Sequence, residues 1–234
     1  MEAFVVTDGV IRMRPEWRHK LWINFYRDRV IEEAVQVKDD DGEVFTKDIE
    51  DLRINNHSTI EYLHQFRHAI TETNNLKNLK RLEICKVLFT AEKAKLLSDA
   101  LSSSRCRVIE LIFDRCRAKS DKMGMLFGAL AHNSSISSLT LQNMNIPRDS
   151  LVAMVDLLAS NRTVCMLTLL NCGLSDNSVN ILSQGLHQNK NIIYLDLRQN
   201  SFEQEGFRHL LLSLNGQSLL TLRINGMLIE SEDV

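Results

Sequence analysis

The sequence has little proline, no long apolar run and no large excess of charge of either sign. Only two of the 234 residues are proline, which argues against a proline-rich linker. No apolar run approaches the roughly 18 residues of a membrane span, and the amino terminus lacks the basic start and long apolar stretch of a secretory signal. The net charge of −2 disfavours nucleic acid or an anionic membrane as a partner.

Cysteine is also sparse, and its count is odd. There are five cysteines and no CxxC pair. This usage favours free thiols packed in the core of a cytoplasmic protein, in a reducing compartment, over disulfides or a metal site. The cysteines are Cys85, Cys106, Cys116, Cys165 and Cys172.

Sequence motifs that carry catalysis are absent. No glycine-rich phosphate loop, nucleophile elbow or HExxH occurs. His64 and His68 stand four residues apart, a spacing able to hold a metal, but no further ligand is evident nearby, so a polar helix face is favoured. We therefore expect a non-enzyme with no catalytic residues, no cofactor and no metal.

What the sequence has is a repeat. One leucine recurs at steps of 30, 29, 28, 28, 28 and 27 residues, with apolar residues three positions before it and two positions after it in each copy. A fixed period of 20 to 50 residues indicates stacked repeats. The recurring residue, here called the key leucine, is Leu52, Leu82, Leu111, Leu139, Leu167, Leu195 and Leu222.

Each copy begins with a short strand pattern. Side chains alternate between the two faces of a strand. In the copy that begins at Val164, Leu167 and Leu169 therefore face the core, while Met166 and Leu170 face away from it.

A helical pattern follows each strand. Apolar residues three and four apart lie on one face of a helix. Such trios are Ala94, Leu97 and Leu101; Met123, Leu126 and Leu130; Leu151, Met154 and Leu158; Val179, Leu182 and Leu186; Phe207, Leu210 and Leu214. Between copies stand Asn133, Asn161 and Asn189, which we expect to adopt the left-handed conformation that ends helices.

The pattern resembles the leucine-rich repeat, LxxLxLxxN/C, over residues 49–229, and its period near 28 with a helix in each copy is similar to the ribonuclease-inhibitor-like subclass. The Asn or Cys position is filled by Cys116, Cys172 and Asn200, whereas His57, Val87, Met144 and Met227 depart from it. The resemblance implies an α/β solenoid of about seven repeats. Because strands lie about 4.8 Å apart and packed helices 8–10 Å, such a stack bends, with a parallel sheet on its concave face and helices on its convex face.

Three segments are expected: an amino-terminal cap over residues 1–48, the repeats over 49–229 and an acidic tail over 230–234. After the last strand, Leu219 to Ile224, no further helix is predicted. This edge either stays soluble through the acidic tail or packs on a partner or a second copy.

The predicted cap has two elements. Phe4–Val6 and Val10–Met13 flank a Thr-Asp-Gly turn and predict a hairpin. Pro15 then suits the start of a helix that runs to about Val35. That helix either seals the first repeat or offers a second partner contact through Trp17, Trp22 and Phe25.

The predicted concave face is the candidate binding surface. Its amino-terminal end alternates in charge, with Arg53 beside Glu83 and with Arg81 between Asp51 and Glu110. Its centre combines apolar and aromatic residues with an arginine, which is the composition of a binding hot spot. The alternatives are ordinary surface apolar residues or a centre covered by cap or tail. The expected contacts are Met166, Thr168, Leu170, Tyr194, Asp196, Arg198, Thr140 and Gln142.

We therefore predict an adaptor, scaffold or assembly subunit that binds a protein through its concave face. One alternative is a structural subunit of a large assembly, such as a cytoskeletal one, held by its cap and carboxyl-terminal edge. Another is a GTPase-activating regulator that resembles Ran GTPase-activating proteins in repeat type. The arginines that such a regulator would draw on are Arg105, Arg107, Arg115 and Arg117, on or beside strand ends.

Overall fold

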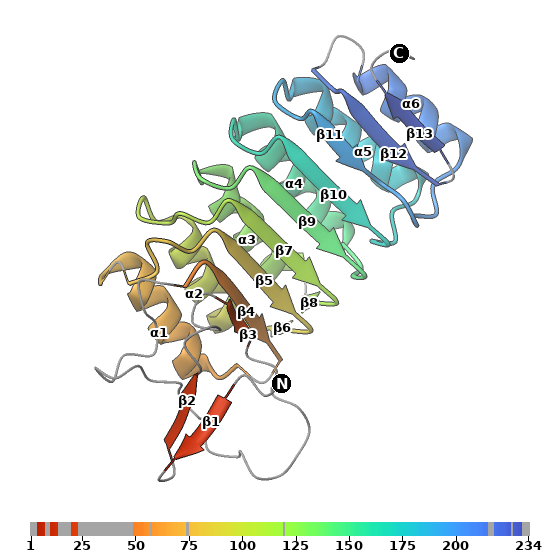
Figure 1. Ribbon diagram of the computed structural model, residues 1–234. Coiled ribbons are helices and arrows are strands. Elements are labelled where there is room, and N and C mark those ends of the chain that lie inside the picture. The colour runs from red at the N-terminus through yellow and green to blue at the C-terminus, as the bar shows by residue number, and fades with distance from the viewer. Residues whose placement is uncertain are drawn as a thin grey trace.

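The chain alternates strands and helices in two layers, one mostly parallel sheet and one row of helices (Figure 1). The computed structural model describes residues 4–7, 10–13, 20–22, 49–56, 58–73, 75–118, 120–214, 218–225 and 227–230. Side chains are described for residues 49–56, 58–73, 75–118, 122–214 and 218–225.

The main sheet has nine strands in the order β13-β12-β11-β10-β9-β7-β5-β4-β3, and β13 is its one antiparallel strand. Two smaller sheets pair β1 with β2 and β6 with β8. The strands are β1 (Phe4–Thr7), β2 (Val10–Met13), β3 (Lys20–Trp22), β4 (Asp51–Asn55), β5 (Arg81–Cys85), β6 (Leu88–Phe89), β7 (Glu110–Asp114), β8 (Arg117–Ala118), β9 (Ser138–Gln142), β10 (Met166–Leu170), β11 (Tyr194–Asp196), β12 (Thr221–Ile224) and β13 (Met227–Glu230).

Six helices in the described part of the chain cover one face of the main sheet, each packed on the next (Figure 1). They are α1 (Ile60–Thr71), α2 (Ala91–Leu101), α3 (Ser120–Ala131), α4 (Arg148–Ser160), α5 (Asp176–Gln188) and α6 (Gln204–Leu214). The sheet face away from the helices is called the open face below. None of the described helices has the length and apolar content that crossing a bilayer requires.

Strand pairing confirms the predicted register. Leu167 stands between Leu139 and Leu195 on neighbouring parallel strands. All seven key leucines are at most 2% exposed. Because full burial of one leucine contributes about 1.5–3 kcal/mol, this column is a large part of the core.

The helix trios are also confirmed, since Val179, Leu182 and Leu186 in α5 are buried, as are most of their counterparts. The exception is Phe207, which is partly buried. Helix α1 starts where Thr59 accepts a hydrogen bond from the backbone N–H of Tyr62.

At the amino terminus the hairpin is confirmed, because β1 and β2 pair antiparallel. The predicted helix from Pro15 to Val35 is wrong at 20–22, which form β3, and the rest of it lies outside the described residues. Leu21 pairs with Leu52 and so extends the key-leucine column by one strand. The spacing of apolar residues in a short run does not distinguish a helix from a strand. Here the segment forms a strand because it pairs with β4.

The carboxyl-terminal strand β12 lies where it was predicted, but β13 was not expected. β13 pairs antiparallel with β12, with Met227 opposite Ile224 and Glu230 opposite Thr221. The edge that we expected to be open therefore carries one more strand of the chain itself.

The prediction for the inter-repeat asparagines is wrong in its conformation. Asn161 (φ −70°, ψ 137°) and Asn189 (φ −83°, ψ 133°) have extended backbones. Their amides instead bridge repeats: Asn161 Nδ2 donates to Leu130 O at 2.8 Å, and Asn189 Nδ2 to Leu158 O at 2.7 Å. Each side-chain oxygen also accepts two backbone N–H groups of the following loop. These buried amides therefore join one copy to the previous one.

Left-handed backbone occurs instead just after five of the strands, four residues beyond the key leucine. This conformation directs a backbone N–H toward the next copy. Asn143 N donates to Leu170 O at 3.0 Å, and Asn171 N donates to Arg198 O at 3.1 Å. The residues with positive φ at this position are Lys86, Arg115, Asn143, Asn171 and Gln199.

The Asn or Cys column holds neighbouring copies together. Asn200 Nδ2 donates to Leu169 O at 2.7 Å, and the Cys172 thiol takes the same place with Leu141 O at 3.3 Å. Burial raises the pKa of the Cys116 and Cys172 thiols to about 12. All five cysteines are free, and all but Cys165 are buried.

Candidate functional site

The eight predicted contact residues lie together on or just beyond three neighbouring strands of the open face. Thr140 and Gln142 are on β9, and Met166, Thr168 and Leu170 are on β10. The register places Met166 beside Tyr194, Thr168 between Thr140 and Asp196, and Leu170 beside Gln142. Arg198 follows two residues after the end of β11.

The centre of this face carries an apolar patch, defined as Met166, Leu170 and Tyr194. The Met166 side chain is 42% exposed, and Leu170 and Tyr194 are partly exposed. Leu167 and Leu169 on the same strand are buried toward the helices. Strand alternation therefore sends one set of apolar residues into the core and leaves the patch on the surface.

Beside the patch lies an arginine cluster, defined as Tyr194, Asp196, Arg198 and Arg223. The Asp196 side chain is 2% exposed and is held by Arg198, whose Nη2 donates to Oδ2 at 2.7 Å and whose Nε donates to Oδ1 at 2.9 Å. The Tyr194 hydroxyl donates to the same Oδ2 at 3.3 Å. On β12, Arg223 Nη1 lies 3.3 Å from the Tyr194 hydroxyl and 3.8 Å from Asp196 Oδ2.

Opposing effects set the charge of Asp196. Burial alone would raise its pKa, but the hydrogen bonds from the side chain and backbone of Arg198 outweigh burial and hold the pKa below the ordinary aspartate value. The same contacts raise the pKa of Arg198. The cluster thus contains two guanidinium groups and one carboxylate, with one positive charge in excess.

Charges at the other end of the open face neutralise one another. Arg81 Nε lies 3.0 Å from Glu110 on β7, and Arg53 Nη2 lies 3.2 Å from Glu83 on β5. These cross-strand ion pairs join the alternating charges that the sequence places at this end of the open face. Being partly exposed, each stabilises the fold by only about 0–1 kcal/mol.

One group of metal-ligand types occurs in the described part of the chain, formed by Glu83, Cys85 and Asp114. Three arginines pair with this group. Arg53 Nη2 lies 3.1 Å from the Cys85 sulfur, Arg81 Nη2 lies 3.7 Å from Glu83, and Arg115 Nη2 lies 2.7 Å from Asp114. The group is therefore part of an ion-pair network of the sheet.

The two histidines singled out by their spacing face acids of the helix layer. His64 Nε2 lies 3.6 Å from Glu92, and His68 Nδ1 lies 2.9 Å from Glu72. All four side chains are about half exposed. The pairs fit the polar helix face that the sequence favoured.

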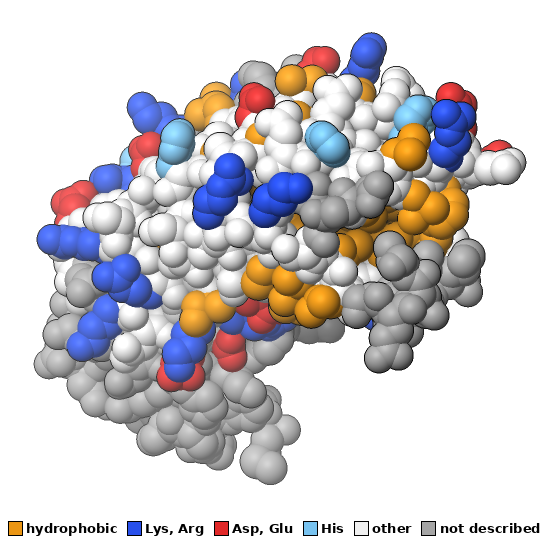
Figure 2. Space-filling model, turned by 90° about the horizontal axis from the view of Figure 1, so that it is seen from above, with side chains coloured by type: hydrophobic (Ala, Val, Ile, Leu, Met, Phe, Trp, Pro, Cys, Tyr) orange, Lys and Arg blue, Asp and Glu red, His pale blue; other side chains and the backbone are white. Residues whose placement is uncertain are grey.

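Sequence reasoning missed two contributors to this surface. The first is Arg223, which the sequence does not identify as a site residue because its approach to Tyr194 depends on neighbouring repeats. The second is an edge column two positions before the key leucine, where Ile109 (46%), Ile193 (38%) and Leu220 (54%) are exposed. The position is apolar in these three copies but holds Glu50, Lys80 and Ser137 in others, so the sequence gives only a partial signal for it. Hydrophobic side chains gather along the lower edge and the right of the view in Figure 2.

The cap residues proposed as a second contact are not brought to this site by any described contact. Trp17 and Phe25 lie outside the described residues. Trp22 ends β3, and its Cα pairs with that of Arg53.

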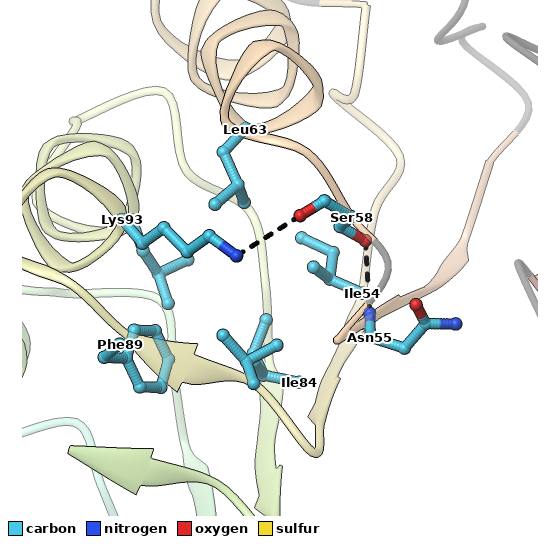
Figure 3. A pocket seen from close by; sticks show the side chains of 9 residues that line it. Ile54, Asn55, Ser58, Leu63, Ile84, Phe89 and Lys93 are labelled. Atoms are coloured by element: carbon cyan, nitrogen blue, oxygen red, sulfur yellow. Dashed lines mark hydrogen bonds between the residues drawn. The ribbon is translucent and has the colours of Figure 1, made fainter. Parts of the chain in front are cut away.

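A small pocket lies between the first two strand–helix units, beyond the ends of β4 and β5 (Figure 3). Lys93 Nζ donates to Ser58 O across it at 3.4 Å. Its volume of ≈ 10 Å³ is about what one water molecule needs, so it does not fit an organic ligand. It is lined by Ile54, Asn55, Ser58, Leu63, Ile84, Val87, Phe89, Lys93 and Leu97.

The four arginines considered for GTPase activation do not converge. Arg105 and Arg107 precede β7, whereas Arg115 and Arg117 follow it, so the two pairs lie at opposite ends of this strand. Arg105 donates to Glu72 O at 2.7 Å, and Arg115 is bound to Asp114.

Comparison with known proteins adds no family. A scan against protein-family models finds no match to this chain, and a search of curated proteins finds none either.

Proposed function

We propose that this chain is a leucine-rich-repeat solenoid of the ribonuclease-inhibitor-like type that binds a protein partner through the open face, the concave face of such a solenoid. It would serve as an adaptor, scaffold or assembly subunit. The in-register leucine column supports the repeat type, as do the Asn200 and Cys172 contacts between copies. Extended sheet surfaces of this kind are what solenoids use for binding.

The observation that carries the binding proposal is the apolar patch. Met166, Leu170 and Tyr194 stand on strands that pair on both sides, so their backbones are fixed before any partner arrives. A patch held on rigid strands loses little entropy on binding. With an arginine at its border, it has the composition of an interface centre.

The test is an affinity pull-down followed by cross-linking mass spectrometry. We compare the intact chain with a Met166→Glu, Leu170→Glu, Tyr194→Ala variant. Each added glutamate would place an unpaired carboxylate in the interface, so loss of the partner is expected. In the intact complex, cross-links should map to segments that flank β9, β10 and β11.

The matched control is a Met125→Glu, Val152→Glu variant. Met125 in α3 is 40% exposed, close to the 42% of Met166, and Val152 in α4 is 54% exposed, but both lie in the helix layer. This variant should keep the partner. Equal retention by both variants, with both shown to be folded by circular dichroism, would show that the open face is not the binding surface.

A second candidate is a structural subunit of a larger assembly held by its ends. Leu212 in α6 is 61% exposed and Leu220 before β12 is 54% exposed, so apolar side chains gather at the carboxyl-terminal end. A Leu212→Glu, Leu220→Glu variant would then lose assembly in size-exclusion chromatography, whereas changes to the apolar patch would not affect it.

A further inference from the structure

We propose that the open face selects a partner segment in which an acidic residue stands two positions from a bulky apolar residue, with the carboxylate bound by Arg198 and Arg223. This inference rests on the proposed function and names the chemistry of its partner. It follows from the arginine cluster, the apolar patch and the distance between them.

The first observation is an excess of positive charge that the described residues do not neutralise. Asp196 is the one carboxylate among the described open-face side chains of β9 to β12, and it is shared by Arg198 and Arg223, while the next acidic position of the sheet is Glu230 in β13, opposite Thr221. Arg198 uses Nε and Nη2 for this contact, and the described residues offer no hydrogen-bond acceptor to its Nη1. A second carboxylate would balance the cluster.

The second observation is that both guanidinium groups are held in place yet accessible. Their side chains are 36% and 37% exposed for Arg198 and Arg223. The buried Asp196 fixes the first group from below, and the Tyr194 hydroxyl positions the second. Because these arginines are already ordered, binding an anion costs less side-chain entropy than it would at a free surface arginine.

The third observation is the spacing between charge and apolar surface. β10 and β11 are neighbours, so Met166 and Leu170 lie about 5 Å from β11 across the sheet, and Asp196 stands two residues, about 7 Å, along β11 from the residue paired with Met166. In an extended peptide, residues i and i+2 point the same way at about 7 Å. An acidic side chain therefore reaches the arginines while an apolar one rests on Met166, Leu170 and the Tyr194 ring.

The charge count favours a carboxylate over a phosphate. One surplus positive charge matches one carboxylate, whereas a phosphorylated residue brings about −1.5 to −2. The experiment includes a phosphoserine peptide as a separate arm.

The probe is a phage-displayed random dodecapeptide library, selected on the full chain. Selected peptides are synthesised, and their affinities are measured by fluorescence anisotropy at low and high salt. We expect the selected sequences to share Asp or Glu two positions from Leu, Ile, Phe or Trp. Replacement of that acid by its amide should weaken binding by about tenfold, which corresponds to one charge-assisted contact of about 1.4 kcal/mol.

The protein variant is Arg198→Gln, Arg223→Gln, in which the acid and amide peptides should bind equally. Because Arg198→Gln removes the main partner of the buried Asp196, Arg223→Gln alone is the second variant, and it should reduce the acid preference while leaving the Arg198–Asp196 pair intact. The charge-matched control is Arg105→Gln, Arg162→Gln, at exposed arginines of the inter-repeat loops. It should keep the full preference.

The outcomes separate this inference from the proposed function. Peptides that lose binding with the apolar-patch variant but ignore both arginine variants would leave the proposed function standing and overturn the inference. Tighter binding by the phosphoserine peptide than by the glutamate peptide would overturn the carboxylate assignment. Tighter peptide binding after deletion of residues 231–234 would show that the chain's own acidic tail occupies the site, and would overturn assignment to a partner.

Discussion

The two halves of the open face use charge in different ways. In the amino-terminal half, on β4, β5 and β7, arginines meet acids across strands, as in the Arg81–Glu110 and Arg53–Glu83 pairs. In the carboxyl-terminal half, on β9 to β12, one carboxylate faces two arginines beside the apolar patch. Arg53 and Arg81 in the first half thus each have an acid of their own, whereas Arg198 and Arg223 in the second half share one.

Both halves nevertheless contain a buried aspartate whose carboxylate forms an ion pair with an arginine. Arg115 and Asn143 close over Asp114, with Asn143 Nδ2 2.9 Å from Asp114 Oδ1. Over Asp196 lie Arg198 and Arg223. The halves therefore differ in the second group at the carboxylate, which is a neutral amide in one half and a cation in the other.

The largest expected effect comes from removing the carboxylate that organises the carboxyl-terminal half. Asp196→Ala leaves Arg198 without its partner and the Tyr194 hydroxyl without its acceptor. We expect a loss of roughly 3 kcal/mol in the free energy of unfolding, near the lower end for breaking a buried pair because Arg198 remains partly hydrated. Urea denaturation followed by circular dichroism measures it.

Glu110→Ala is the matched control in the other half. Glu110 is 41% exposed in its pair with Arg81, so its loss should cost at most about 1 kcal/mol. If the two variants lose the same stability, Asp196 is not the organising group, and the contrast between the halves fails.

A smaller effect is expected from pH, and it touches both halves. Burial raises the pKa of Asp114 and Asp196, but the hydrogen bonds to each carboxylate and the positive charge of the neighbouring arginines together lower it by more, so both lie below the unfolded value of about 3.9. Their contribution to stability is therefore fully present above that value and is lost as the pH falls through the folded pKa.

Urea midpoints measured between pH 7 and pH 2.5 test this dependence. Stability should be nearly flat from pH 7 to pH 5 with respect to these groups and should fall below about pH 4. Asp114→Asn and Asp196→Asn should each make the acid limb shallower. An acid limb of unchanged slope in both variants would contradict the assignment.

The strands, the core and the open-face columns were predictable because their period is written in the sequence. Strand alternation places Leu167 inward and Met166 outward whatever the neighbouring copies are. The eight contact residues followed from that register, which places them on or just beyond neighbouring strands, and their role in binding stays a prediction.

What was missed depends on contacts between copies or on competition between elements. The Asn161 and Asn189 amides bridge repeats, and nothing within one copy shows the carbonyls that they reach. Leu21 lies in the sheet because β3 pairs with β4, which places Leu21 beside Leu52. The approach of Arg223 to Tyr194 likewise crosses from one strand to the next.

The smallest expected effect is the coupling energy between Arg81 and Glu110. It tests whether the ion pairs of the amino-terminal half hold that half together weakly or tightly. A double-mutant cycle with Arg81→Ala and Glu110→Ala should give a coupling energy of about 0.5 kcal/mol in urea denaturation, because the pair is partly exposed and screened. The coupling should weaken further when salt is raised from 0.05 to about 1 M, where the Debye length falls to about 3 Å. A coupling above about 1.5 kcal/mol that persists in high salt would mean that this half is held as tightly as the Asp196 cluster. The halves would then differ only in that Arg198 and Arg223 share one carboxylate, Asp196.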